Sequence, residues 1–194
     1  MAFEFAIRNE EWRDWSRQFK GAVFTEGNLW NDHSLLIPVG RHRITLDTYR
    51  AGDWRRRSWH TRVYTPYVPA NNWSFRLTRK LGQNALDDFT RATGVSLTRS
   101  IETRDAAFNS NYILKSNDEI KARALFENPR VRSRLPAKFP FTLRTGCQSV
   151  TARHLPKGEG FLIFHMEDVI VEPTFARTLC LLFGEMMSHL QPHA

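Results

Sequence analysis

Few residues in this chain have the types and spacing that a reaction centre needs. Cys147, with His154 or His165, could form a thiol nucleophile and its base. Such a site also needs hydrogen-bond contact between the two groups and an oxyanion donor, and the sequence specifies neither. A buried or incidental thiol is therefore the expectation for Cys147. A thiol-based enzyme site near Cys147 and His154 stays open as an alternative.

Acids and histidines give equally weak signals. Asp87–Asp88 and Glu167–Asp168 are adjacent pairs, and neighbouring side chains of a strand point to opposite faces, which does not favour paired acid–base catalysis. His42, His60 and His154 stand alone, without the further ligands that a zinc site requires. The sequence therefore predicts no catalytic residue, no metal and no cofactor.

Cationic residues give the strongest chemical signal. Residues 41–80 hold ten Lys and Arg against two acids, while the rest of the chain holds eighteen of each, so this segment carries the whole net charge of +8. Guanidinium groups pair with phosphates, and tyrosine and histidine can stack on exposed bases. The candidate anion-binding residues are Arg43, Tyr49, Arg55, Arg56, Arg57, His60, Arg62, Tyr64, Arg76 and Lys80.

This pattern favours a non-enzymatic binding or interaction module with a basic sheet face. Its partner would be a polyanion, either nucleic acid or an acidic protein. The competing explanation is a solvated outer face whose arginines neutralise acids elsewhere, which is the commoner meaning of a run of charge. A structural scaffold that forms oligomers is a further alternative.

The elements that must position these residues follow from hydrophobic spacing. Aromatic residues at helical intervals predict a helix over 10–20. Alternation of apolar with polar residues predicts strands over 43–50, 58–67 and 73–80. Each of these strands has one apolar and one basic side, so together they suggest an antiparallel meander.

The second half of the chain alternates strands with helices. Phe108–Lys115 is expected to form a strand, and Ser116–Glu119 is a capping pattern for a helix that should stop near Asn128. Further strands should follow Phe139, and Pro173 opens a last helix with a wide apolar stripe. The sequence thus predicts an α+β fold, a single domain over 1–194, with a mainly antiparallel sheet and the N- and C-terminal helices packed on its apolar face.

One segment also carries a resemblance. Phe108–Asp118 has the form F-N-x-x-[YF]-x-[VIL]-x-[SC]-x-D, a strand leading into a helix, and Trp12, Trp15, Gly40 and Tyr49 stand in matching order before it. In these features the chain resembles a family of uncharacterised bacterial proteins. The resemblance implies no catalytic residues. Many of those relatives carry a membrane-spanning region ahead of the domain, and this sequence departs from them in showing none.

Composition limits the class of protein that this sequence can form. The chain has 194 residues, 41% hydrophobic and 12% aromatic, which suits a protein with a real core. Its two cysteines and the lack of a secretory signal favour free thiols and a cytoplasmic location. No apolar run approaches the roughly 20 residues that cross a bilayer. Tryptophans at regular spacing are expected in the core rather than in a ligand cage: Trp12, Trp15, Trp59 and Trp73.

Overall fold

The computed structural model describes most of the chain. The described residues are 9–27, 33–51, 58–69, 72–80, 100–137, 139–146, 160–170 and 172–191. The helices are α1 (Asn9–Gln18), α3 (Ala106–Asn111), α4 (Glu119–Phe126), α5 (Pro129–Arg132) and α6 (Pro173–Leu190). The strands are β1 (Val23–Thr25), β2 (Ser34–Val39), β3 (His42–Ala51), β4 (Ser58–Tyr67), β5 (Phe75–Arg79), β6 (Ser100–Ile101), β7 (Tyr112–Ser116), β8 (Thr142–Gly146) and β9 (Gly160–Met166).

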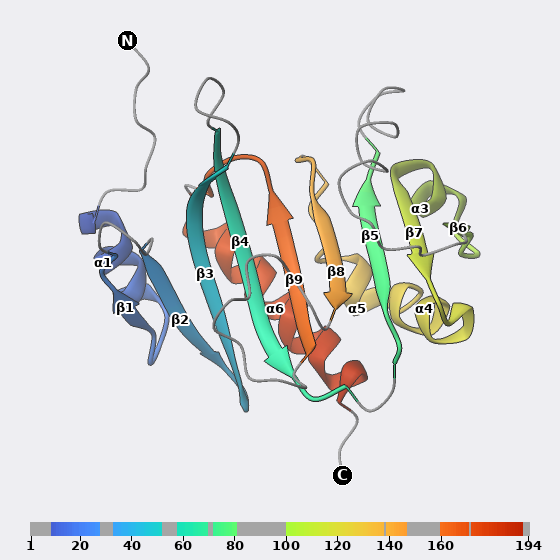
Figure 1. The fold of residues 1–194 in the computed structure, drawn as a ribbon, viewed down its shortest axis with the longest axis horizontal. Helices are drawn as coiled ribbons and strands as arrows, with labels where there is room; N and C mark the ends of the chain where they lie inside the picture. Colours follow the sequence, from blue (N-terminus) through green and yellow to red (C-terminus); the bar gives the residue numbers. More distant parts are fainter. Residues whose placement is uncertain are drawn as a thin grey trace.

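The strands form one antiparallel sheet with the helices behind it, so the predicted α+β fold is confirmed (Figure 1). The strand order is β1-β2-β3-β4-β9-β8-β5-β7-β6. The predicted meander holds for β3 and β4 but is wrong for β5, because β9 and β8 lie between β4 and β5. Nearly every residue of β9 is buried, as expected for a central strand covered on both faces.

A continuous row of apolar side chains crosses all nine described strands. Directly opposed residues of an antiparallel pair point to the same side, so the strand registers place this row on one face. Its members are Phe24, Leu35, Leu46, Val63, Phe164, Leu143, Leu77, Leu114 and Ile101. All of them belong to the hydrophobic core or pack against it. The opposite side of the sheet, which we call the outer face, carries mostly polar side chains, together with the buried Phe161 and Ile163 of β9.

Helix α6 covers the apolar side of the sheet. Pro173 suits the first helical turn because its missing N–H has no partner there anyway. The predicted stripe is buried, with Leu179, Leu182, Phe183 and Met186 in the core. Gly184 lets the helix approach β2 closely, since a Cβ at this position would lie 2.9 Å from Cγ1 of Val39.

The four tryptophans predicted for the core lie in it or pack against it. Trp12 and Trp15 of α1 are 0% and 5% exposed, and their rings lie 5.9 Å apart. Trp59 and Trp73 are partly buried against the same core. Both terminal helices therefore help to bury the apolar face of the sheet.

The predicted strand over Phe108–Lys115 is wrong in its first half. Asp105 accepts hydrogen bonds from the backbone N–H groups of Ala107 and Phe108, at 2.8 and 3.1 Å, and so caps α3. This cap turns Phe108 inward as a buried helical residue, and the strand begins at Tyr112. The predicted helix after Ser116 is confirmed, but the capping box is wrong: the N-cap is Asp118, which accepts from the backbone N–H of Lys121 at 3.0 Å.

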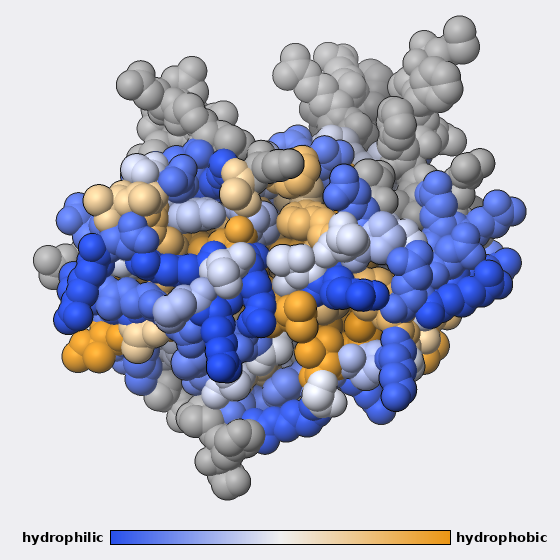
Figure 2. All heavy atoms as spheres, turned by 180° about the vertical axis from the view of Figure 1, so that it is seen from behind, coloured by the Kyte–Doolittle hydropathy of each residue, from blue (hydrophilic) through white to orange (hydrophobic). Residues whose placement is uncertain are grey.

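The helix-bearing side of the molecule has a mixed surface. Figure 2 shows apolar atoms between polar ones near the middle of this side. None of the described helices is long and apolar enough to span a bilayer.

Candidate anion-binding face

The outer face carries most of the residues that the sequence nominated. Strand alternation and register place Arg43 and Tyr49 on this face from β3, and His60, Arg62 and Tyr64 from β4. Arg76 reaches the same face from β5, through its pairing with Arg144. The prediction that separate strands present these side chains to one side of the sheet therefore agrees with the structure.

The nominated residues do not form one tight cluster. Arg43 lies six residues from Tyr49 along β3, about 20 Å of extended chain. Arg76 lies three strands away from Arg62, about 14 Å at normal strand spacing. Lys80 leaves the sheet, and its Nζ donates to the carbonyl of Asn109 at 2.6 Å. Arg55, Arg56 and Arg57 lie outside the described residues, as do Cys147 and His154 of the thiol alternative.

Arg62 is the centre of the first group and is already paired. Its Nε and Nη2 donate to the two carboxylate oxygens of Asp47, at 3.0 and 2.6 Å. Burial alone would lower the pKa of Arg62, but the hydrogen bonds and charge of Asp47 outweigh burial and raise it. The guanidinium carbon also lies 5.1 Å from the ring centres of Tyr49 and Tyr64. Arg62 and Asp47 thus form an ion pair that carries no net charge. The two tyrosine rings contact the Arg62 guanidinium rather than lying open for stacking on bases.

A chain of hydrogen bonds runs beside this ion pair, at the ends of β4 and β9. Oγ of Ser58 lies 2.9 Å from Nε2 of His60, and Nδ1 of His60 lies 3.1 Å from Nε2 of His165. Ser58 also donates to Oε1 of Glu167 at 3.3 Å. The ring of Tyr49 stacks on His60 at 5.4 Å between ring centres. This series of hydrogen bonds connects the exposed carboxylate of Glu167 to the half-buried imidazole of His165 on the outer face.

The environment keeps both imidazoles neutral at pH 7. Burial lowers the pKa of His60, against a smaller opposing effect of the Glu167 charge. Burial and the charges of His60, Arg144 and Arg62 lower the pKa of His165 to about 4. Proton binding to His165 therefore depends first on its burial and then on the positive charges around it.

A second group forms a cationic row, which we define as Arg144, Arg76 and Lys115. Arg144 of β8 is directly opposite Arg76 of β5, and Arg76 is directly opposite Lys115 of β7. Arg76 is only 7% exposed, while Arg144 and Lys115 are half-buried. Burial and the charge of Arg144 lower the pKa of Arg76, and burial lowers that of Arg144. Cations in direct register repel one another, which makes this row costly to assemble.

Two members of the row, Arg144 and Lys115, have no side-chain ion pair among the residues that the structure describes. Within these residues no side chain offers Arg144 a hydrogen bond or an ion pair. The carboxylate of Asp47, on the same face, forms an ion pair with Arg62 at 2.6 Å. An anion placed over the row would therefore relieve repulsion as well as gain direct contacts.

Other kinds of site have less support in this structure. Among the described residues, no group of three or more His, Cys, Asp or Glu side chains is arranged to hold a metal ion. Cys180 is a buried free cysteine of α6, and burial raises the pKa of its thiol to about 12. A thiol with that pKa is protonated at neutral pH and is a poor nucleophile.

Sequence reasoning missed three residues of this face: Lys115, Arg144 and His165. All three lie outside the charge-rich segment 41–80, from which the basic sheet face was predicted. Alternation around Leu143 and Leu114 could have placed Arg144 and Lys115 on the polar side of their strands. Their direct alignment with Arg76 depends on strand order, which no local pattern specifies.

Comparisons with known proteins assign neither a family nor a function to this chain. No family model, no curated protein and no solved structure matches this chain. The resemblance to an uncharacterised bacterial family stays a prediction.

Proposed function

We propose that this protein is a binding module that holds a polyanionic partner on the outer face of its sheet. The observation that carries the proposal is the cationic row. Like charges in direct register across neighbouring strands repel one another, and a bound anion would offset that repulsion and accept contacts from Arg144 and Lys115.

The members of the row contribute in different ways. Arg144 and Lys115 are half-buried and can contact the anion directly, while the buried Arg76 adds positive potential beneath them. Arg43, exposed on β3, extends the basic surface toward one end of the sheet. The ion pair of Arg62 with Asp47 stabilises the face and adds little net charge.

The arrangement supports recognition of charge more than recognition of bases. The rings of Tyr49 and Tyr64 contact Arg62, and Tyr49 also stacks on His60. Base stacking would need those ring faces to be released. Backbone phosphates of a nucleic acid or the carboxylates of an acidic protein satisfy the same requirement for several anionic groups in a line.

The proposal is tested by binding to two probes at several salt concentrations. Single-stranded oligo(dT) and poly-glutamate are titrated by fluorescence anisotropy against the wild type and the variants Arg144→Gln and Lys115→Gln. Each variant should bind more weakly, and each lost phosphate contact should reduce the slope of log K against log salt by about 0.7. A preference between the probes identifies the kind of partner.

Arg17→Gln is the matched control. It also removes one positive charge, but Arg17 lies on α1, is highly exposed and pairs with Asp14. Affinity unchanged in Arg144→Gln and Lys115→Gln would show that the cationic row is not the binding site. An equal reduction in Arg17→Gln would show that net charge rather than the row causes binding. Urea unfolding of each variant checks that the fold is retained.

A further inference from the structure

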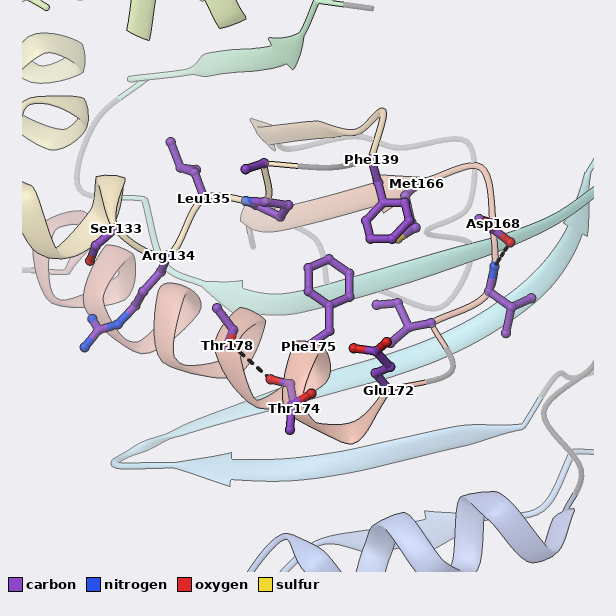
Figure 3. Close-up of a pocket in the computed structure, with 14 residues that line it drawn as sticks. Ser133, Arg134, Leu135, Phe139, Met166, Asp168, Glu172, Thr174, Phe175 and Thr178 are labelled. Carbon is purple, nitrogen blue, oxygen red and sulfur yellow. Dashed lines mark hydrogen bonds between the residues drawn. The ribbon is translucent and has the colours of Figure 1, made fainter. Parts of the chain in front are cut away.

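A cavity of about 410 Å³ opens on the helix-bearing side of the molecule, away from the outer face. Its walls come from the segment after α5, the connection between β9 and α6, and the first turns of α6. Leu135, Met166 and Ile170 form part of an apolar lining, together with the rings of Phe139 and Phe175 (Figure 3). This volume lies within the range of about 300–1,000 Å³ that is typical of small-molecule sites.

Two phenylalanine rings at this cavity, those of Phe139 and Phe175, are at least partly accessible to solvent. Phe139 is 38% exposed, although large apolar side chains are usually covered. Its ring centre lies 5.6 Å from that of Phe175, with the planes inclined by 48°. Figure 3 shows the rings of Phe139 and Phe175 next to each other at the cavity. An apolar group seated there would remove aromatic surface from water.

The described lining of this cavity is acidic, in contrast to the basic chain as a whole. Glu172 precedes α6 and makes no capping hydrogen bond to it. Asp168 accepts a hydrogen bond from the backbone N–H of Val169 at 2.7 Å. Arg134, the one cation of the described lining, pairs with Glu185 at 3.3 Å. Its guanidinium points away from the two phenylalanine rings in Figure 3.

We propose that this cavity binds a small amphipathic cation, with an apolar body between Phe139 and Phe175 and an ammonium or guanidinium group near Glu172. The apolar walls accept the body of the ligand. The carboxylates of Glu172 and Asp168 and the faces of the two rings all attract the positive group. This site shares no residue with the outer face and does not depend on the proposed polyanion partner.

Three probes of similar shape test the ligand class. Phenethylamine, 2-phenylethanol and phenylacetate share a phenyl body and differ in charge at pH 7. Each is titrated into the full chain while amide chemical shifts are followed by NMR. The amine should bind about fivefold more tightly than the alcohol, since one favourable contact of a cation with a carboxylate or a ring has about that effect. The alcohol should bind more tightly than the acid.

Two variants and one control locate the site. Glu172→Gln should reduce the affinity of the amine to that of the alcohol, and Phe175→Ala should weaken binding of both. Glu167→Gln removes an exposed carboxylate that does not line the cavity, and it should leave all three affinities unchanged. Urea unfolding checks that Phe175→Ala is folded, and Glu172→Gln, at an exposed position, tests the charge without disturbing the core.

These titrations test the charge of the ligand and the location of the site separately. Saturable binding of the amine with shifts confined to the cavity segments and α6 supports it. Equal affinity for the amine and the acid would overturn the proposed cationic ligand. Failure of every probe to saturate, or shifts that do not respond to Phe175→Ala, would overturn the site itself.

Discussion

The pH dependence of stability should report directly on the charged surroundings of His165. In the folded protein, burial together with the charges of His60, Arg144 and Arg62 lowers the pKa of His165 from 6.5 to about 4, and Glu167 opposes this in part. The unfolded chain therefore binds the proton more tightly than the folded protein does. Stability that depends on neutral His165 is fully present above pH 6.5 and is lost as the pH falls toward 4.

The size of this effect follows from the same pKa. At about 1.4 kcal/mol per pH unit, the lowering corresponds to about 3 kcal/mol of unfolding free energy at pH 4. Because solvent reaches part of the ring, we expect about 2 kcal/mol.

The measurement compares the wild type with His165→Gln in urea unfolding at pH 7.5, 6, 5 and 4. Glutamine can hydrogen-bond to His60 but does not titrate, so acid effects from other groups largely cancel in the difference. The stability of the wild type relative to the variant should fall steadily below pH 6.5. A difference that stays constant from pH 7.5 to pH 4 would refute the reasoning, because it would mean that the fold does not disfavour the charged imidazole.

Three further predictions concern particular contacts. Asp47→Asn should destabilise the fold by about 2–3 kcal/mol in urea unfolding, because it leaves Arg62 half-buried beside an uncharged amide; a loss below 0.5 kcal/mol would contradict the importance of this ion pair. Leu143→Ala removes a fully buried member of the apolar row and should cost about 3 kcal/mol in the same assay, whereas an unchanged midpoint would show that this row is not packed as described. Cys180 should resist iodoacetamide at pH 8 in the native protein and react after unfolding, as peptide mass spectrometry can show; rapid native alkylation would contradict its burial.

The fold could be predicted from the sequence where local patterns decide the structure. Alternating residues identified β3 and β4, and the spacing of aromatic and apolar residues identified α1 and α6. Local patterns do not specify strand order, which is why the insertion of β9 and β8 before β5 was missed. The error at Phe108 is also local: the cap by Asp105 starts a short helix where alternation alone suggested a strand.

The candidate site was less predictable because its important features are contacts between distant segments. The charge of residues 41–80 correctly indicated a polar side of the sheet with Arg43, Arg62 and Arg76. The pairing of Arg62 with Asp47 depends on the register of β3 and β4, and the alignment of Arg76 with Arg144 appears only when β5 and β8 are placed side by side in the sheet. The sequence thus indicated which face to consider, and the structure changed which of its residues are available for an anion.

Amide chemical-shift mapping with oligo(dT) and poly-glutamate would test the central claim most directly. We expect at least one of these probes to shift the amides around Arg144 and Lys115 on β8 and β7, and to leave those of the buried stripe of α6 unchanged. Shifts centred on α6, or no shifts with either probe at low salt, would contradict a polyanion site on the outer face.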